Sequence, residues 1–380
     1  MTPPGRAEVV VIGGGAMGTS IAFHLAEAGA DVLLLERGEL GSGSTGKAAG
    51  GVRAQFSDPV NIELGARSLR AFARFDERPG GCIDLRRNGY LFLLTDPADV
   101  AAFEESVRLQ NACGVPSRML TAREAGELSP PVSVEDVLAG AFSPTDGHCT
   151  PDGVVQGYAA GARRCGARIQ RHCAVTGIEV TGGAVTGVRT DAGPVATSAV
   201  VCAAGAWSAA VGAMAGVELP VRPLRRQILV TEPAPGLPDR LPFTIDFGTG
   251  FYFHEEGPGL LMGMPDPLDS AEPHLDDGWL ELLADTVEQR APALAALGAA
   301  HRWAGLYELS PDHNALIGSA AEVRGFLYAT GFSGHGFLQS PAVGEVVRDL
   351  VLDRPPPVDV SGLGVDRFAR DEHRPERNLV

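Results

Sequence analysis

The sequence lacks the features that mark several common protein classes. None of its six cysteines forms a Cys-x-x-Cys pair with another, so we expect neither a zinc knuckle nor a redox dithiol, and no metal site. No apolar run reaches the ~20 residues of a membrane-spanning helix. The opening MTPPGRAEVVVIGGG lacks the basic stretch followed by an apolar stretch that is typical of a secretory signal peptide. These absences predict a cytoplasmic protein without a membrane partner.

Positive charge is also scarce. The chain has 31 basic residues against 47 acidic ones, and the resulting net charge of −16 argues against nucleic acid as a partner. Lys47 is the only lysine. Because of this bias towards arginine, a position that needs a cation should carry arginine, and an apolar residue there indicates a true loss of charge.

A βαβ unit opens the chain. With 380 residues, 44% of them hydrophobic, the chain exceeds one usual core, so we expect two domains. Residues 8–13 and 31–36 are predicted strands around a predicted helix at 16–29. Gly13, Gly15 and Gly18 form G-x-G-x-x-G at the first turn. Glu36 ends the second strand, where its carboxylate can accept a hydrogen bond from a ribose hydroxyl. This context predicts a dinucleotide site; a chance glycine-rich turn is the alternative.

A second glycine-rich segment, GFSGHGFLQSPAVGEVV, lies at residues 331–347. Its glycines Gly331, Gly334 and Gly336 allow another group to approach the main chain closely. Ser340 and Pro341 have the pattern of an N-cap and first-turn pair, which predicts a helix start there. A loop that enters a helix N-terminus favours an anion.

Five motifs in order resemble the D-amino acid oxidase family of FAD-dependent amine oxidoreductases, in its sarcosine oxidase and glycine oxidase branch. They are VVVIGGGAMG, GSGSTGKAAGGVR, VVCAAGAWS, GLYELSPDHNALIG and the 331–347 segment. The resemblance implies an α/β fold, with a Rossmann-like FAD-binding domain and a second, substrate domain containing a mixed β-sheet. The first would comprise residues 1–84, 145–222 and 301–380, and the second 85–144 and 223–300. The second nucleotide fingerprint and dithiol of glutathione-reductase-like flavoproteins are missing.

The resemblance also implies which residues contact FAD. They are Gly13, Gly15, Ala16, Met17, Gly18, Glu36, Arg37, Ser44, Thr45, Lys47, Ala49, Gly50, Gly51, Val175, Ala204, Gly205, Trp207, Gly331, Ser333, Gly334, His335, Gly336 and Phe337. Core packing is the alternative for Trp207. Some family members tether FAD to a cysteine, where this chain has Gly305, so the FAD is expected to be non-covalent.

Four residues are candidates for the catalytic site: Arg53, Tyr252, Tyr307 and His335. Arg53 matches the family arginine that binds the substrate carboxylate, which a guanidinium can hold through two hydrogen bonds. Tyr307 stands where other members carry an arginine. The alternatives are an exposed loop arginine, a core tyrosine at 252, and a packed or solvent-facing imidazole at 335.

Other family cations are replaced. Two family lysine positions are occupied by Leu338 and Leu261 in this chain. The residues expected beside them are Phe247, Phe251 and Met262. This implies an apolar wall that suits an apolar substituent on the substrate nitrogen. Of two adjacent arginines, Arg225 and Arg226, one could form an internal salt bridge and the other be exposed or reach the site. The charged tail RFARDEHRPERNLV is expected to be solvated.

The implied reaction is hydride transfer from the carbon beside a neutral amine to the flavin, followed by hydrolysis of the imine. The substrate would be an amino acid with its amine beside a carboxylate, in particular an N-substituted glycine with an apolar substituent. The electron acceptor would be O2 or another molecule. Two alternatives stay open: a β-subunit of a larger sarcosine or proline dehydrogenase that passes electrons to a partner, and a nicotinamide-dependent dehydrogenase.

Overall fold

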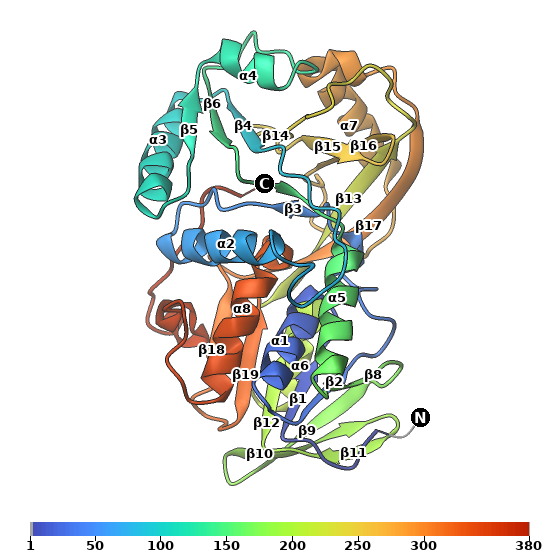
Figure 1. The fold of residues 1–380 in the computed structure, drawn as a ribbon, viewed down its shortest axis with the longest axis vertical. Coiled ribbons are helices and arrows are strands. Elements are labelled where there is room, and N and C mark those ends of the chain that lie inside the picture. The colour runs from blue at the N-terminus through green and yellow to red at the C-terminus, as the bar shows by residue number, and fades with distance from the viewer. Residues whose placement is uncertain (1–2, 380) are drawn as a thin grey trace.

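The predicted first strand lies in a six-stranded sheet of the computed structural model, which describes residues 3–379 (Figure 1). In spatial order the strands are β18 (Leu316–Ser319), β19 (Phe326–Thr330), β12 (Ala199–Cys202), β1 (Val9–Ile12), β2 (Val32–Leu35) and β8 (Arg168–Gln170). All neighbouring pairs are parallel except β18–β19. Helical crossovers join parallel strands, as the βαβ pattern predicted.

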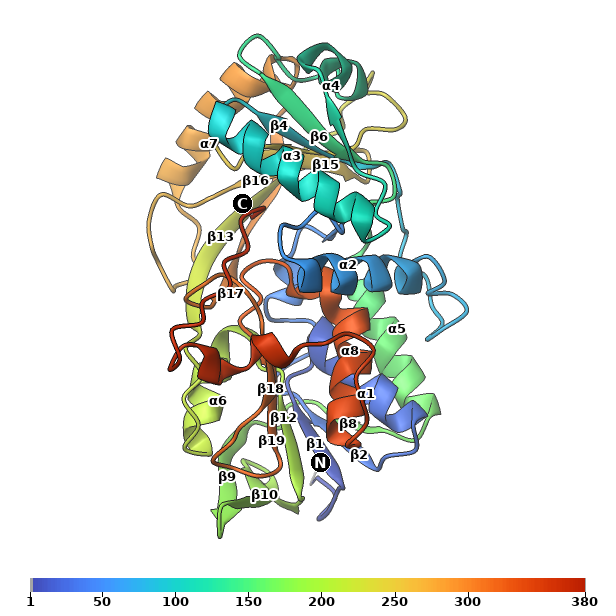
Figure 2. The same ribbon diagram turned by 90° about the vertical axis from the view of Figure 1, so that its left-hand side faces the viewer.

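Both faces of this sheet are covered. One face packs against α1 (Ala16–Glu27), α5 (Pro151–Arg164) and α8 (Gly336–Val351) (Figure 2). The other faces α6 (Ser208–Met214) and a small sheet of β9 (Val175–Thr181), β10 (Ala184–Thr190) and β11 (Gly193–Ala196). Along β1, Val9 and Val11 join the first layer, whereas Val10 and Ile12 join the second. This two-sided burial explains why the strand is a continuous apolar run.

The second large sheet has eight strands of mixed direction. In spatial order they are β17 (Ala299–Leu309), β13 (Arg222–Thr231), β16 (Gly259–Met264), β15 (Tyr252–Glu256), β14 (Phe243–Asp246), β4 (Tyr90–Leu94), β6 (Ala139–Ser143) and β5 (Arg118–Leu120). Only the β14–β4 pair is parallel. The expected mixed sheet is therefore confirmed.

Helices cover this sheet as well. Leu91 and Leu93 of β4 pack on the side of α4 (Ala122–Leu128) and α7 (Asp277–Arg290), and Phe92 and Leu94 on the side of α3 (Pro97–Ala112). The sequence predicts helices at 99–112, 121–128 and 276–297, and α3, α4 and α7 confirm them. α7 ends at Arg290, before residue 297, because Pro292 follows and begins the short 3₁₀ turn Pro292–Leu294.

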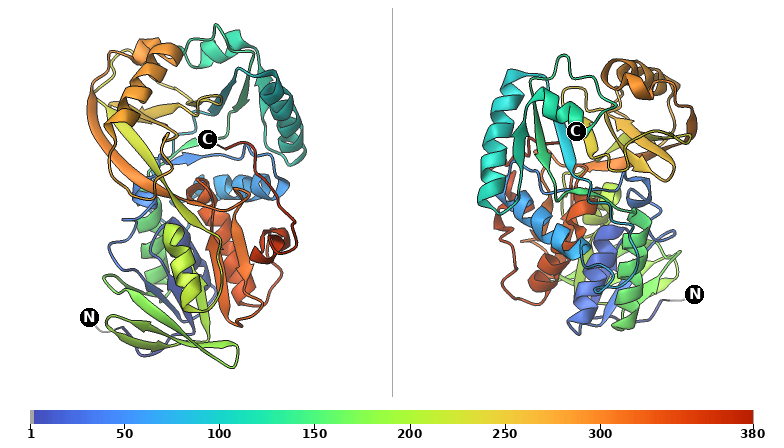
Figure 3. Two further views of the ribbon diagram at one scale, coloured as in Figure 1. Left: turned by 180° about the vertical axis from the view of Figure 1, so that it is seen from behind. Right: turned by 45° about the horizontal axis from the view of Figure 1, so that its top comes forward.

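The two large sheets are joined by the long pair β13–β17, which runs from one layer towards the other (Figure 3). Between the sheets lie α2 (Pro59–Phe72) and a two-stranded ribbon of β3 (Gly51–Val52) and β7 (Gly147–His148). The 3₁₀ turns Thr45–Lys47 and Gly205–Trp207 border the same region. The long glycine- and serine-rich loop after Glu36 is confirmed, since it holds only the first of these turns before β3.

The predicted start of the last helix is wrong. α8 begins at Gly336, so Ser340 and Pro341 lie inside the helix. Pro341 has no N–H for the carbonyl of Phe337, and the Ser340 hydroxyl donates to that carbonyl instead, at 2.8 Å. The serine therefore compensates for the proline within the helix, and the helix N-terminus moves one turn towards the preceding glycines.

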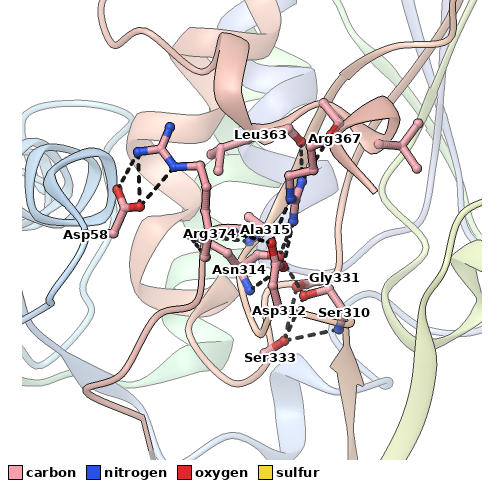
Figure 4. A network of polar contacts seen from close by, with 12 residues as sticks. Asp58, Ser310, Asp312, Asn314, Ala315, Gly331, Ser333, Leu363, Arg367 and Arg374 are labelled. Carbon is pink, nitrogen blue, oxygen red and sulfur yellow. Dashed lines mark hydrogen bonds and ion pairs between the residues drawn. The ribbon is translucent and has the colours of Figure 1, made fainter. Parts of the chain in front are cut away.

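The expectation of a solvated tail is confirmed for residues 369–373, which are exposed, but it is wrong for other parts of the tail. Arg367 is buried and forms an ion pair with buried Asp312 at 2.8 Å, and Arg374 pairs with Asp58 at 3.1 Å (Figure 4). Glu376 is buried. Its carboxylate accepts hydrogen bonds from the backbone N–H groups of Ser57 and Asp58, just before α2, and from the side-chain amide of Asn61 in α2. These partners are distant in sequence, so the charge pattern of the tail alone could not reveal them. Among residues 3–379, no helix is long and apolar enough to cross a membrane.

Candidate active site

A cavity of about 590 Å³ lies between the two large sheets and gathers most of the predicted site residues. Arg53, Tyr252, Tyr307 and His335 all line it. The predicted cofactor residues that line it are Gly13, Gly15, Ala16, Met17, Glu36, Arg37, Ser44, Thr45, Lys47, Ala49, Gly50, Gly51, Val175, Ala204, Gly205, Trp207, Ser333, Gly334, Gly336 and Phe337. Segments from both ends and the middle of the chain thus meet at one site.

Two predicted cofactor residues lie outside the cavity wall. A Cβ on Gly18 would stand 1.9 Å from the Gly13 carbonyl oxygen, so this glycine lets α1 pack against the turn. Gly331 has φ +70° and packs against Ser310 and Leu316. Both glycines have a packing role in the structure, and their contact with the cofactor stays a prediction.

The β1–α1 turn forms one end of the cavity. Gly13 has φ +114°, and a Cβ there would lie 2.3 Å from the Ala203 carbonyl oxygen, so only glycine fits. The Glu36 carboxylate accepts hydrogen bonds from the backbone N–H groups of Gly14 and Gly38, each at 2.7 Å. Its place on the wall is therefore fixed at the end of β2.

These residues fit FAD. Gly15 caps α1 without a side-chain hydrogen bond, and the helix N-terminus lies beside the cavity, where a pyrophosphate would need N–H donors. The Ala16 N–H of this first turn donates to the Thr45 hydroxyl oxygen at 3.1 Å. Glu36 lies where an adenosine ribose would need an acceptor. The Ser44 hydroxyl is buried on the wall without a hydrogen-bond partner in the described chain. A polar group of this kind is satisfied when a ligand supplies the partner.

Arg53 dominates the other end. Its side chain is buried, donates to the carbonyl oxygens of Gln55 and Asn378, the latter at 2.6 Å, and lies 4.1 Å from the Phe56 ring centroid. Burial lowers its pKa. Four arginines are buried in residues 3–379, and the other three form ion pairs with aspartates: Arg225, Arg290 and Arg367. Arg53 has no carboxylate partner within this described range.

Aromatic side chains surround the space beside Arg53. Phe243 stacks on Tyr90 with ring centroids 4.3 Å apart and on Tyr252 at 5.5 Å. Burial raises the pKa of both tyrosines, to well above the usual value for Tyr252, so both are neutral phenols. Tyr252 thus belongs to the cavity wall, whereas the alternative placed it in the core.

The apolar wall is built differently from the prediction. Leu338 lines the cavity, but Leu261, Phe247, Phe251 and Met262 do not. Phe251 and Met262 pack under α7, and Phe247 packs towards α3. The apolar wall residues from the substrate-side sheet are instead Ile228, Phe243, Ile245 and Leu306. The error arises because the sequence does not give the strand pairing and helix packing that decide which residues reach the cavity.

His335 lies directly before α8. Its imidazole is buried, and both ring nitrogens lack a hydrogen-bond partner among the described residues. Burial, together with the charge of Arg53, lowers its pKa to about 3. The ring is therefore neutral at physiological pH and can accept one hydrogen bond and donate another.

Sequence reasoning missed Glu308. This residue is half-buried and lines the cavity, and its carboxylate accepts hydrogen bonds from the Thr330 hydroxyl at 2.8 Å and the Gly331 N–H at 3.2 Å. Burial raises its pKa to about 7. An acidic residue inside GLYELSPD, beside the tyrosine that was singled out, was the available signal. Leu379 of the tail also lines the cavity, and no local pattern indicated it.

Comparisons with known proteins agree with this geometry. A model of the family DAO, FAD dependent oxidoreductase, matches residues 8–350. Mitochondrial dimethylglycine dehydrogenase of Mus musculus is 31% identical over 96% of this chain and 44% of its own length, so the chain spans less than half of that relative. The crystal structure of L-proline dehydrogenase from P. horikoshii has a TM-score of 0.93 at 33% identity, covering 98% of this chain and 100% of that one.

Glycine oxidase from Geobacillus kaustophilus superposes with a TM-score of 0.86 at 26% identity, covering 96% of this chain and 99% of that one. A nicotinamide cofactor, the alternative that the sequence left open, is wrong because the matching family depends on FAD. The chain belongs to the DAO family of FAD-dependent oxidoreductases and binds FAD.

Proposed function

We propose that this protein oxidises an N-substituted glycine at the carbon beside its amine, with Arg53 as the anchor of the substrate carboxylate. The observation that carries the proposal is that Arg53, among the four buried arginines of residues 3–379, forms no ion pair with a carboxylate, whereas the other three do. A buried guanidinium without a carboxylate is unfavourable until an anion arrives. A relative named dimethylglycine dehydrogenase supports an N-substituted substrate.

The bound FAD supplies the hydride acceptor. Arg53 would hold the carboxylate, and the wall of Phe243, Tyr252 and Tyr307 would orient the amine and exclude water from the reacting carbon. His335, neutral at physiological pH, can accept a hydrogen bond from a substrate N–H. Water then hydrolyses the imine product, so the chain needs no nucleophile of its own.

We further propose that the cofactor residues on the cavity wall contact FAD, and that the flavin is not covalently bound. Gly305 lines the cavity without a side chain that could form a bond, and a Cβ there would lie 2.6 Å from the Lys47 Cβ. We also propose residues 1–84, 145–222 and 301–380 as the FAD-binding domain and residues 85–144 and 223–300 as the substrate domain. β17 crosses the boundary at 301 and pairs within the second sheet.

Anaerobic reduction of the flavin tests the function. The holoenzyme is mixed with glycine, sarcosine, N,N-dimethylglycine, L-proline, D-amino acids or N-alkylglycines of increasing length, and loss of the visible flavin absorbance is followed. We expect N-substituted glycines to bleach the flavin, and to do so faster than glycine does. Bleaching by L-proline or D-amino acids alone would contradict the proposal.

The same samples identify the electron acceptor. Recovery of colour on admission of air indicates an oxidase. Recovery only with an artificial dye favours transfer of electrons to a partner, as a β-subunit of a larger dehydrogenase would require.

A further inference from the structure

Two adjacent arginines on β13 differ in their partners. Arg225 is fully buried and forms ion pairs with Asp266 at 2.6 Å and Asp276 at 3.2 Å. Arg226 lines the cavity and donates only to the Arg225 carbonyl oxygen, at 3.0 Å. Its Nε is buried without a hydrogen-bond partner, and no carboxylate of the described residues forms an ion pair with it. The second of the two arginines therefore keeps most of its donors for a ligand.

Arg226 lies at the substrate end of the cavity. Its guanidinium carbon is 5.0 Å from the centroid of the Tyr307 ring. Tyr307 in turn packs against Gly334, where a Cβ would stand 2.6 Å from the ring, one residue before His335. The pyrophosphate end, formed by the β1–α1 turn, is a different part of the wall. An anion held by Arg226 would thus lie beside the reacting amine.

Arg53 lies in the same part of the cavity. The Arg53 guanidinium carbon lies 5.9 Å from the centroid of the Tyr90 ring. Tyr90 stacks on Phe243, which stacks on Tyr252, and these three rings line the same cavity as Arg226. Each guanidinium lies over an aromatic ring, Phe56 for Arg53 and Tyr307 for Arg226. Lys47, a third cation of the wall, is exposed and is solvated by water.

A substrate with one carboxylate would satisfy only one of these arginines. Arg226 is half-buried, and its Nε is buried without a partner among the described residues. Charge-assisted hydrogen bonds to a guanidinium are strong and directional, so this side chain can gain them when a carboxylate binds. We propose that Arg226 is a second carboxylate anchor, and that the substrate is therefore a secondary amine with two carboxylates, an N-(carboxyalkyl) amino acid. This inference rests on the proposed function, since it assumes that Arg53 holds the first carboxylate.

Unreactive sulfur analogues test the inference by binding alone. Thiodiacetate carries two carboxylates, whereas (methylthio)acetate carries one, and both are titrated into the holoenzyme while the visible flavin spectrum reports binding. We expect thiodiacetate to bind at least about tenfold more tightly, the effect of one further charged hydrogen-bonding group. Equal dissociation constants in the wild-type protein would overturn the inference.

Variants locate the effect. Arg226→Met should weaken thiodiacetate binding by about tenfold or more and change (methylthio)acetate binding by less than about twofold. Arg222→Met is the matched control, because Arg222 is an exposed arginine on the same strand, paired with exposed Asp269. An equal loss for both analogues in Arg226→Met would show that the arginine acts on the flavin or the fold, and would overturn the assignment. The wild-type comparison decides the matter if that variant fails to fold.

Turnover separates this inference from the proposed function. We expect iminodiacetate to have a higher kcat/KM than sarcosine. If sarcosine is oxidised and the second carboxylate brings no gain, the inference fails while the function stands. If neither compound bleaches the flavin and another amino acid does, the proposed function itself fails.

Discussion

Replacement of Arg53 by alanine tests the anchor on which the proposed reaction depends. Its side chain is 5% exposed and donates to the carbonyl oxygens of Gln55 and Asn378 while it lines the cavity. A hydrogen bond to a charged group contributes about 1.5–3 kcal/mol, so loss of the carboxylate contact should raise the dissociation constant by roughly 10- to 160-fold. The dissociation constant of (methylthio)acetate, measured from the flavin spectrum, is the quantity to compare.

The same replacement leaves two buried carbonyl oxygens without their donor. We therefore expect a parallel decrease of about 1–3 kcal/mol in the free energy of unfolding, measured with urea. Arg53→Lys keeps the charge but loses the bidentate geometry, and should fall between wild type and alanine in ligand affinity. Comparing the two variants separates the loss of charge from the loss of stability.

A cation at the opposite end of the cavity provides the control. Arg37 lies 4.0 Å from the Trp207 ring centroid on the nucleotide side of the wall. Arg37→Met should lower the affinity for FAD and leave carboxylate binding to the FAD-saturated enzyme unchanged, whereas Arg53→Ala should do the reverse. Binding of (methylthio)acetate to Arg53→Ala within about twofold of wild type would refute the anchor.

Three further predictions concern the absence of a covalent bond to FAD, the C-terminal tail and the acidic residue Glu308. Acid precipitation should leave a white pellet and a yellow supernatant, because Gly305 offers no side chain for a covalent bond; a yellow pellet would contradict this. Glu376→Ala removes the acceptor of the Ser57 hydroxyl at 2.7 Å and should destabilise the protein by about 1–3 kcal/mol and raise KM, measured by urea unfolding and steady-state kinetics; unchanged values of both would refute a role for the tail. Glu308 has a pKa raised from 4.5 to about 7, so the native state binds its proton more tightly than the unfolded state and loses about 3 kcal/mol of stability as pH rises from 4.5 to 7. Glu308→Gln should remove that loss in urea unfolding followed across this range, and a variant with the wild-type pH profile would show the pKa to be wrong.

Local patterns predicted the nucleotide end of the site well. Gly13 and Glu36 belong to one contiguous βαβ unit, in which glycine spacing and apolar runs determine the turn and the strand end. The order of five motifs predicted that both chain ends and the middle meet, and residues 8–350 match the family as expected. Local chemistry suffices here because each motif carries its own backbone requirement.

The substrate end was predicted less well, for reasons of register and distance. Leu261 and Met262 are adjacent in β16, and neither lines the cavity. Strand pairing and helix packing decide which residues reach the cavity, and the sequence alone does not give them. Arg225 and Arg226 were predicted as a pair with divided roles, but the sequence could not say which would be paired internally. Asp266, the partner of Arg225, is 41 residues away.

The charges of the cavity follow a single physical rule. Arg367 and Asp312, each 1% exposed on its side chain, compensate one another inside the protein, so the fold can bury them without a ligand. Arg53 is also removed from water, but its hydrogen bonds go to carbonyl oxygens and its guanidinium lies over an aromatic ring. Burial lowers the pKa of Arg53 and the carboxylates of Glu376 and Asp146 act against that shift, yet within residues 3–379 neither forms an ion pair with it. A carboxylate at about 4 Å from such a cation, at an effective dielectric constant of ~20, gains roughly 4 kcal/mol of Coulomb energy. The fold therefore leaves Arg53 without a directly paired carboxylate at the place where a substrate can supply one, and this ties its burial to recognition as well as to the stability that its two carbonyl hydrogen bonds provide.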